Sequence, residues 1–187
     1  MSDAPMPFTH LDGSGNARMV DVTEKQPTVR AATAAGAVRC SPEVVALLRD
    51  GAVPKGDVLA VARVAGIQAA KKTPELLPLA HVIGVHGCTV DLTVTDSGVD
   101  IVATARTADR TGVEMEALTS VSVAALAVID MVKGIDRTAR IEHVRLLRKE
   151  GGRSGTWVAE DDGVDASASS TTSSSSPAAP GAASGGR

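Results

Sequence analysis

The stretch TGVEMEALTSVSVAALAVIDMVK, residues 111–133, predicts one long helix with charged groups at both ends and small apolar residues between them. Asp130 and Lys133 are three residues apart, so they share one face of the helix, one turn from each other. Glu116 precedes Asp130 by fourteen residues, nearly four turns, which returns to the same face about 21 Å away. A small substrate cannot easily touch both ends in one chain. Either the two ends serve different sites, or a second subunit completes each site.

Each end of this helix also has a simpler explanation. Glu114 and Glu116 favour the positive end of a helix whatever their function. Asp130 and Lys133 could form an ordinary surface ion pair worth a few tenths of a kcal/mol. Their joint presence on a helix otherwise made of Ala, Val, Ser and Leu favours a functional interpretation.

Outward from this helix, periodicity predicts strands on both sides. We expect an extended segment over 28–39, a helix from Pro42 to Gly51 and a second helix from Asp57 to about Lys72. Residues 88–95 and 99–107 alternate in polarity and predict a hairpin, and 141–147 predicts a last strand. A glycine inside a helix is costly, so Gly66 suggests the close approach of another backbone. Residues 17–22 suggest one further short strand.

This element order resembles the split βαβ order of ferredoxin-like folds. We therefore expect an α+β fold, a ferredoxin-like antiparallel sheet with helices on one face, and a second chain could cover the other face. The domain spans residues 17–159. Residues 1–16 form an extended N-terminal arm, and residues 160–187, rich in Ser, Ala and Gly, form a disordered tail.

Composition excludes several classes of protein. The formal net charge of −3 gives no global basic surface, and Phe8 and Trp157 are the sole aromatic residues, which argues against nucleic-acid binding. The two cysteines, Cys40 and Cys88, have no metal-ligand spacing and predict small buried side chains in a reducing compartment. The chain shows no secretion signal and no run of about 18 apolar residues. We expect a cytoplasmic protein that associates with no membrane.

Several residues outside the long helix could carry chemistry. Lys55 precedes a helix start, a place suited to phosphate, although a solvated turn lysine is equally consistent with the local sequence. Lys71 and Lys72 end the same helix, where cations stabilise the dipole. His81 stands in an irregular segment after two prolines. The Gly-rich loop at 151–155 can bring its backbone and Arg153 close to an anion, but it is not a P-loop.

Several segments together resemble the MoaC family of molybdenum cofactor biosynthesis, over about residues 8–157. The most specific of these segments is the glutamate motif at residues 111–119. The segments that carry the resemblance are His10 with Met19-Val20-Asp21-Val22, Lys55-Gly56-Asp57-Val58, Ala65-Gly66-Ile67-Gln68-Ala69-Ala70-Lys71, Leu77-Pro78-Leu79-Ala80-His81, Thr111-Gly112-Val113-Glu114-Met115-Glu116-Ala117-Leu118-Thr119, Asp130-Met131-Val132-Lys133 and Val144-Arg145-Leu146-Leu147.

The resemblance implies a lyase. Its substrate would be (8S)-3',8-cyclo-7,8-dihydroguanosine 5'-triphosphate, the product of a radical SAM cyclase, and its products cyclic pyranopterin monophosphate and diphosphate. It implies a ferredoxin-like fold and a hexamer, a trimer of dimers, with active sites between subunits. No cofactor or protein-bound metal is implied, although Mg²⁺ with the triphosphate is compatible.

The resemblance also implies a set of site residues. Asp130, Lys133 and Lys55 take the catalytic positions. The substrate-binding positions are Leu79, Ala80, His81, Glu114, Met115, Glu116, Lys71, Arg30 and Arg153. We expect Lys133, oriented by Asp130, to move protons, and Lys55 with Arg30 to hold phosphates.

The chain departs from the family pattern at two of these positions and at Val82, next to His81. Ala80 and Val82 replace the usual Cys and Pro that flank His81, and Arg153 stands where Lys is common, which keeps the charge but not the geometry. Two competing interpretations are a non-catalytic nucleotide-binding regulator and a MoaC paralogue that binds without turnover. A regulator would tolerate Asp130→Asn and an enzyme would not. The intact acidic and basic set disfavours the paralogue.

Overall fold

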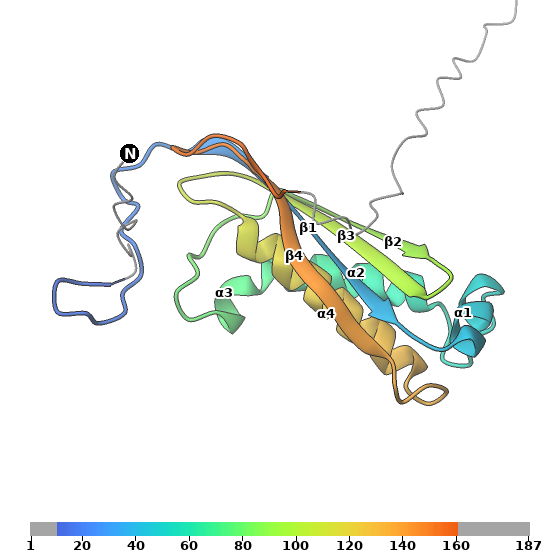
Figure 1. Cartoon of the computed structure of the whole chain (residues 1–187). Coiled ribbons are helices and arrows are strands. Elements are labelled where there is room, and N and C mark those ends of the chain that lie inside the picture. Colours follow the sequence, from blue (N-terminus) through green and yellow to red (C-terminus); the bar gives the residue numbers. More distant parts are fainter. Residues whose placement is uncertain (1–10, 161–187) are drawn as a thin grey trace, which may run out of the picture.

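The computed structural model describes residues 11–160 of the 187-residue chain. The first ten residues of the predicted arm and all of the predicted tail except Glu160 lie outside the described residues. The described part folds as a sheet with helices packed against it (Figure 1).

A five-stranded antiparallel sheet forms one layer, in the order β2-β3-β1-β4-β5. The bounds are β1 Thr28–Arg39, β2 Gly87–Val94, β3 Gly98–Asp109, β4 Arg140–Glu150 and β5 Trp157–Val158. β1 and β3 pair without interruption from Thr28↔Asp109 to Arg39↔Gly98, whereas the pairing of β1 with β4 contains register shifts. The first four strands have the ferredoxin-like arrangement that the element order predicted.

The helices form the second layer. Their bounds are α1 Pro42–Arg49, α2 Val58–Lys71, α3 Thr73–Leu76 and α4 Glu114–Val132. The predicted helix starts are confirmed, because the side chain of Ser41 accepts from the Val44 N–H and that of Asp57 from the Ala60 N–H. α2 and α4 lie along the same side of the sheet (Figure 1).

Small side chains let these layers approach closely. Gly36 lies on β1 beneath α4, and a Cβ added there would stand 2.8 Å from Cγ1 of Val121. Gly66 of α2 faces α4, and a Cβ there would stand 2.9 Å from the Ser120 carbonyl oxygen. The predicted reason for Gly66 is therefore confirmed. Because the core is built from Val, Ala and Ile, with Ile101 among its largest members, close backbone contact provides packing that aromatic rings supply elsewhere.

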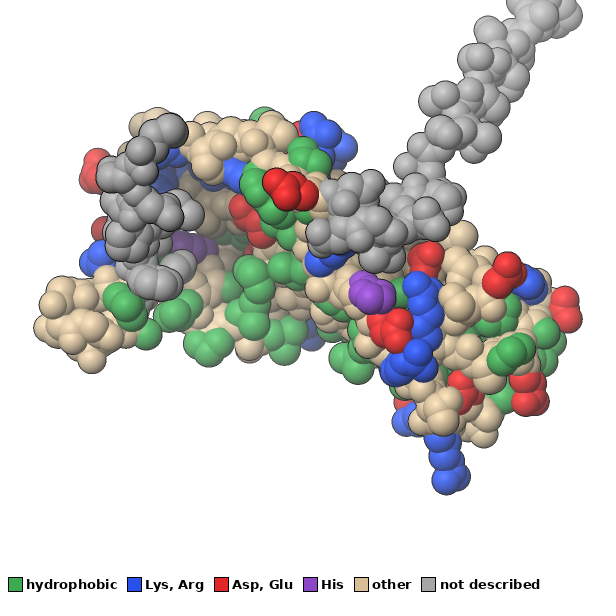
Figure 2. Space-filling view, in the orientation of Figure 1, with side chains coloured by type: hydrophobic (Ala, Val, Ile, Leu, Met, Phe, Trp, Pro, Cys, Tyr) green, Lys and Arg blue, Asp and Glu red, His purple; other side chains and the backbone are tan. Residues whose placement is uncertain are grey.

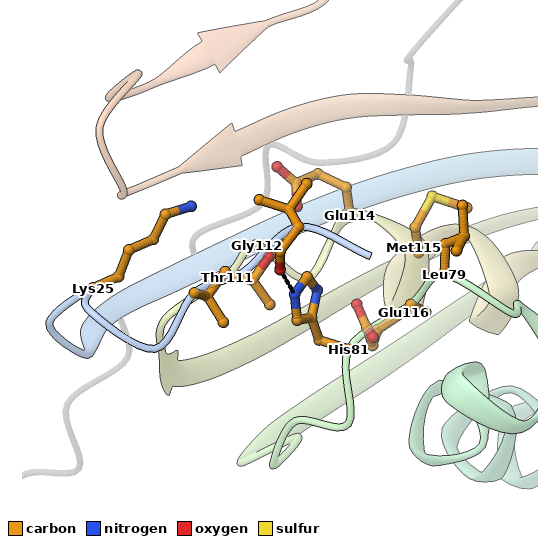
Figure 3. A pocket seen from close by; sticks show the side chains of 11 residues that line it. Lys25, Leu79, His81, Thr111, Gly112, Glu114, Met115 and Glu116 are labelled. Carbon is orange, nitrogen blue, oxygen red and sulfur yellow. Dashed lines mark hydrogen bonds between the residues drawn. The ribbon is translucent and has the colours of Figure 1, made fainter. Parts of the chain in front are cut away.

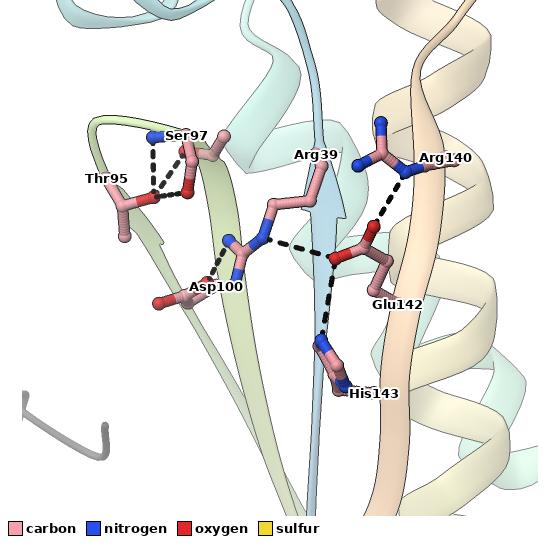
Figure 4. Close-up of polar contacts among 8 residues, drawn as sticks. Arg39, Thr95, Ser97, Asp100, Arg140, Glu142 and His143 are labelled. Atoms are coloured by element: carbon pink, nitrogen blue, oxygen red, sulfur yellow. Dashed lines mark hydrogen bonds and ion pairs between the residues drawn. The ribbon is translucent and has the colours of Figure 1, made fainter. Parts of the chain in front are cut away.

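The opposite face of the sheet carries polar pairs. Thr33 and Thr104, cross-strand partners on β1 and β3, share a hydrogen bond of 2.9 Å between their hydroxyls. Arg39 bridges Asp100 at 2.8 Å and Glu142 at 3.6 Å, so it joins three strands (Figure 4). Acidic, basic and histidine side chains accordingly gather over β4 on the visible surface (Figure 2).

Two expectations about the chain are wrong. Residues 17–22 form no strand, and Ala17 makes an isolated bridge with Leu11 instead, because this segment runs away from the sheet. The expectation that the chain has no apolar segment of membrane-spanning length is wrong as well, because α4 is long and apolar enough to cross a membrane by length and composition alone. It meets that test because it is the central core helix, with Ala117, Val121, Ala124 and Val128 fully buried.

α3 and β5 were not predicted, since four and two residues give no periodic signal.

Candidate active site

A pocket of about 320 Å³ opens at the N-terminal end of α4 (Figure 3). Three segments far apart in the sequence form its walls: the chain before β1, the irregular loop after α3, and the turn that leads into α4. The lining residues are Val20, Val22, Lys25, Leu79, Ala80, His81, Thr111, Gly112, Glu114, Met115 and Glu116. Six of these eleven were predicted from the sequence, and the fold brings those six together.

His81 is fixed in the pocket wall by the backbone. Its Nε2 lies 2.6 Å from the carbonyl oxygen of Val20, and a carbonyl can only accept, so Nε2 carries the hydrogen. In the neutral ring, Nδ1 is then the acceptor, free of that hydrogen. Figure 3 shows this bond, with Glu116 on the other side of the ring. The loop that carries Ala80 in place of the usual cysteine thus still delivers the imidazole to the pocket.

Glu116 is the buried acid of the pocket. It is 3% exposed, although it belongs to the first turn of α4. Burial raises the pKa of the Glu116 carboxyl, and the neighbouring Glu114 carboxylate raises it further. A bond from its own backbone N–H and the positive charge of a protonated His81 act against the shift. The pocket therefore contains a carboxyl that holds its proton more tightly than an ordinary glutamate does.

A second cluster lies at the C-terminal end of α4. The Nζ atom of Lys133 lies 2.7 Å from Oδ1 of Asp130, which confirms that the two share a helix face. Lys55 reaches the same residue from the loop before α2, with its Nζ 2.7 Å from the Asp130 carbonyl oxygen and 3.3 Å from Oδ2. The three predicted catalytic side chains therefore converge, and all three are about half exposed.

Two neighbouring amines favour the ionised form of Asp130. Hydrogen bonds from the amines of Lys133 and then Lys55 hold the pKa of the Asp130 carboxyl below its usual range, and the charges of both lysines add to this effect. The carboxylate thus works as a fixed anion that orients two amines. Their remaining N–H groups can face a phosphate or a reacting proton acceptor.

The remaining predicted residues lie outside the pocket lining. The guanidinium of Arg30 donates from Nε to the Asp109 carbonyl at 3.0 Å and from Nη2 to the Arg110 carbonyl at 3.2 Å. A Cβ added at Gly152 would clash with this guanidinium. Gly151, Gly152 and Gly155 all have positive φ, which bends the loop that presents the exposed Arg153. Lys71 ends α2 and is exposed, outside the pocket lining.

Five lining residues were missed by sequence reasoning: Val20, Val22, Lys25, Thr111 and Gly112. Thr111 and Gly112 precede the glutamates directly, so the motif itself was the available signal. The other three lie on the chain before β1. This segment contacts His81 through the Val20 carbonyl, and no periodic pattern in the sequence predicts that contact. No group of three His, Cys, Asp or Glu side chains in residues 11–160 is arranged to hold a metal ion.

Comparison with known proteins gives a consistent result. Residues 19–152 match the model described as the MoaC family. A cyclic pyranopterin monophosphate synthase of Nocardioides sp. (strain ATCC BAA-499 / JS614) is 59% identical over 160 residues, which cover 84% of this chain and 98% of that protein. The synthase of Streptomyces avermitilis is 60% identical over 150 residues, covering 80% of this chain and 88% of that protein. Cyclic pyranopterin monophosphate synthase 2 of Mycobacterium tuberculosis strain H37Rv is 57% identical, with coverage of 80% and 90%.

Proposed function

The chain belongs to the MoaC family, and from that premise we propose that it is a cyclic pyranopterin monophosphate synthase, an enzyme of an early step in molybdenum cofactor biosynthesis. Its substrate is (8S)-3',8-cyclo-7,8-dihydroguanosine 5'-triphosphate, and it releases diphosphate. The observation that carries the proposal is the 59% identity over 98% of a named synthase, joined to a pocket and a lysine–aspartate cluster at the ends of one helix.

The chemistry needs proton transfer rather than electron transfer. Opening the purine ring and closing the pterin ring require donors and acceptors that work near neutral pH. Lys133, held by Asp130, supplies an amine for these transfers, and the acceptor nitrogen of His81 supplies a base. Glu116, whose pKa is raised by burial, supplies a carboxyl that can still donate a proton where an ordinary glutamate has lost it.

Formation of the cyclic phosphate is a displacement at phosphorus. A hydroxyl oxygen of the substrate attacks the α-phosphorus and loses its proton to a base, while the bond from that phosphorus to the diphosphate oxygen breaks. Negative charge grows on the leaving diphosphate, and cations beside it lower the barrier. Lys55 and Arg30 are the residues that we assign to this task, and Mg²⁺ bound to the triphosphate is compatible with it.

We further propose that each active site is shared between two subunits. In one chain the pocket and the lysine–aspartate cluster lie at opposite ends of the 19-residue helix α4, about 28 Å long. An outer stripe on that helix connects them, through Met115 and Leu126, which are 44% and 56% exposed, to Asp130 and Lys133. On α2, Val61 and Val64 are exposed as well. A second copy packed antiparallel on these helices would bring its lysine cluster to the pocket and cover the apolar stripe.

This contact would form a dimer, and a second contact through the open sheet face would join three dimers. The hexamer that we propose is therefore a trimer of dimers, and we propose that it works in the cytoplasm. Mass measurement by native mass spectrometry tests the assembly. A particle of one chain that turns over substrate at the wild-type rate would contradict the shared site.

The activity is tested by incubating the purified full chain with the cyclised nucleotide and measuring both diphosphate and the oxidised pterin product. We expect one diphosphate for each pterin formed. Lys72→Ala is a suitable control for the effect of removing a surface cation, because Lys72 belongs to neither the pocket nor the lysine–aspartate cluster. Absence of both products with intact, folded oligomer would overturn the proposal.

A further inference from the structure

We propose that His86 is a positioning residue of the active-site pocket. Its imidazole joins the loop that carries His81 to the end of β3, which leads into the turn that carries Thr111 and Gly112. Both segments line the pocket (Figure 3), so a bond between them sets how far apart two of its walls stand. The inference rests on the proposed function and extends it to a residue outside the pocket lining.

His86 closes the loop after α3 onto β3. Its backbone N–H donates to the Arg106 carbonyl at 2.9 Å, and its Nδ1 lies 3.1 Å from the Ala108 backbone nitrogen. Two residues earlier in the loop, the Gly84 carbonyl accepts from the Thr107 hydroxyl at 2.6 Å. Three contacts therefore fasten the end of the loop to the last part of β3.

The contact with Ala108 determines which ring nitrogen of His86 carries the hydrogen. A backbone N–H can only donate, so Nδ1 is the acceptor and the neutral ring carries its hydrogen on Nε2. The Thr107 hydroxyl donates its one hydrogen to the Gly84 carbonyl, so its oxygen faces Nδ1 as a second acceptor at 3.3 Å. The neutral ring in this form is the one that holds the Ala108 N–H.

Protonation of Nδ1 exchanges one partner for the other. The imidazolium carries a hydrogen on both nitrogens, so Nδ1 can donate to the Thr107 oxygen but can no longer accept from Ala108. The loop then loses one of its three contacts with β3. Because His86 is exposed, its ring can take this proton from solvent.

The charged groups beside His86 come from β3 and from its own loop. On β3 they are Arg106 and Asp109, and the Asp109 carboxylate accepts from the backbone N–H of the next residue at 2.7 Å. On the loop the other ionisable group is His81, whose Nε2 is bound to the chain before β1. Within residues 11–160 His86 makes no ion pair. Protonation therefore changes its hydrogen bonding and forms no salt bridge there.

The contact lies close to the residues that line the pocket. Ala108 precedes Thr111 by three residues, and His86 follows His81 by five. His81 is bound to the Val20 carbonyl, so the loop is held on one side by the chain before β1 and on the other by β3. Release from β3 lets His81 and the turn at Thr111 move apart.

Two substitutions separate the acceptor from the titration. His86→Asn keeps an acceptor oxygen near the place of Nδ1 but cannot gain a proton there, and His86→Ala removes the acceptor. His143→Asn is the matched control, because His143 is an exposed histidine on β4, outside the pocket lining, with a φ of 56° that Asn adopts readily.

The first measurement is amide hydrogen exchange of the full chain at about pH 8, where an ordinary histidine is neutral. We expect peptides that cover residues 81–86 and 107–112 to exchange about fivefold faster in His86→Ala than in wild type, because one hydrogen bond is lost. His86→Asn and His143→Asn should stay within about twofold of wild type. Equal exchange in His86→Ala and wild type, or equally fast exchange in His143→Asn, would overturn the inference.

The second measurement is diphosphate release as a function of pH, which a merely structural residue would not alter. At about pH 8 we expect kcat/KM of His86→Ala to be about tenfold below wild type and that of His86→Asn to be within about threefold. Between about pH 8 and about pH 6 the ratio of wild type to His86→Asn should fall about threefold, because only the wild type takes up a proton at this position. All other titrating groups are common to both proteins and cancel in the ratio.

A ratio that stays constant with pH, or a His86→Asn variant as impaired as His86→Ala, would contradict the positioning role. Thermal unfolding shows whether each variant is folded, and if His86→Ala does not fold, the comparison of wild type with His86→Asn decides. Failure of the wild type to release diphosphate from the cyclised nucleotide would instead refute the proposed function, and hydrogen exchange would still report on His86.

Discussion

The two ends of α4 shift the pKa of a carboxyl group in opposite directions. At the N-terminal end the Glu116 carboxyl is buried and its pKa is raised, so the fold favours its neutral form. At the C-terminal end the Asp130 carboxylate is exposed between two amines and its pKa is lowered, so the fold favours its charged form. Two carboxyls whose environments move their pKa values apart are typical of sites that carry out acid and base steps together.

The difference also concerns rigidity. The pocket is built from three segments locked by backbone hydrogen bonds, such as that between Val20 and His81. The lysine–aspartate cluster is built from exposed side chains, and the two lysines are long and flexible. Such side chains keep one conformation only when another protein surface covers them. This contrast is what a shared site requires, because one chain then provides a formed cavity and its neighbour provides adaptable amines.

The strongest test of the contrast is Lys133→Ala. We expect product formation to fall by about 10²–10⁴-fold, because a positioned proton carrier contributes that much to a rate. The Lys133 side chain is 60% exposed, so circular dichroism and oligomer mass should stay unchanged. Turnover at the full rate by this variant would end the assignment of Lys133.

Complementation tests whether the ends meet across subunits. His81→Ala alters the pocket end and Lys133→Ala the other end, and each variant alone should be inactive. Coexpression gives mixed dimers in which one of two sites is intact, so we expect about a quarter of wild-type diphosphate release from a random mixture. If the two ends worked within one chain, coexpression would restore no diphosphate release. Coexpression of two copies of His81→Ala serves as the control.

Close packing of α2 on the middle of α4 stabilises the helix layer between the two ends, and Gly66→Ala tests this packing. The added Cβ would approach the Ser120 carbonyl at 2.9 Å and Cβ of Ala124 at 3.2 Å. We expect a loss of roughly 1–2 kcal/mol in the free energy of unfolding, because overpacking outweighs the better helix propensity of Ala. Gly134→Ala, where the new Cβ meets nothing within 4 Å, is the matched control. Urea denaturation of both variants decides the matter.

The smallest expected effect is a pair of opposite pH dependences. The raised pKa of Glu116 stabilises the fold below the ordinary carboxyl pKa, and that stability is lost as pH rises through the folded value. Glu116→Gln stays neutral, so it should gain stability relative to wild type as pH rises through this interval. Asp130 has a lowered pKa, which stabilises the fold above the ordinary value and is lost as pH falls through the folded one. Asp130→Asn should therefore be less stable than wild type at neutral pH, with the difference closing in acid.

Urea denaturation of both variants and the wild type across a pH series measures these slopes. Slopes of the same sign for the two variants would contradict the electrostatic contrast between the ends of α4.

Local sequence signals were sufficient for most of the fold. Ser41 and Asp57 mark helix starts, the alternation after Cys88 marks a hairpin, and the order of these elements gave the ferredoxin-like arrangement. These features depend on neighbours within a few residues, so spacing reveals them. Spacing also placed Asp130 beside Lys133 and separated both from Glu116.

The tertiary structure decided which distant segments meet. Lys55 reaches Asp130, and Val20 reaches His81 across 61 residues, through contacts that no local pattern encodes. The burial of Glu116 likewise depends on the chain before β1 and the loop after α3 closing over the first turn of α4. Short-range order follows from propensity and periodicity, whereas a pocket and its shifted pKa values arise only when segments remote in sequence exclude water together.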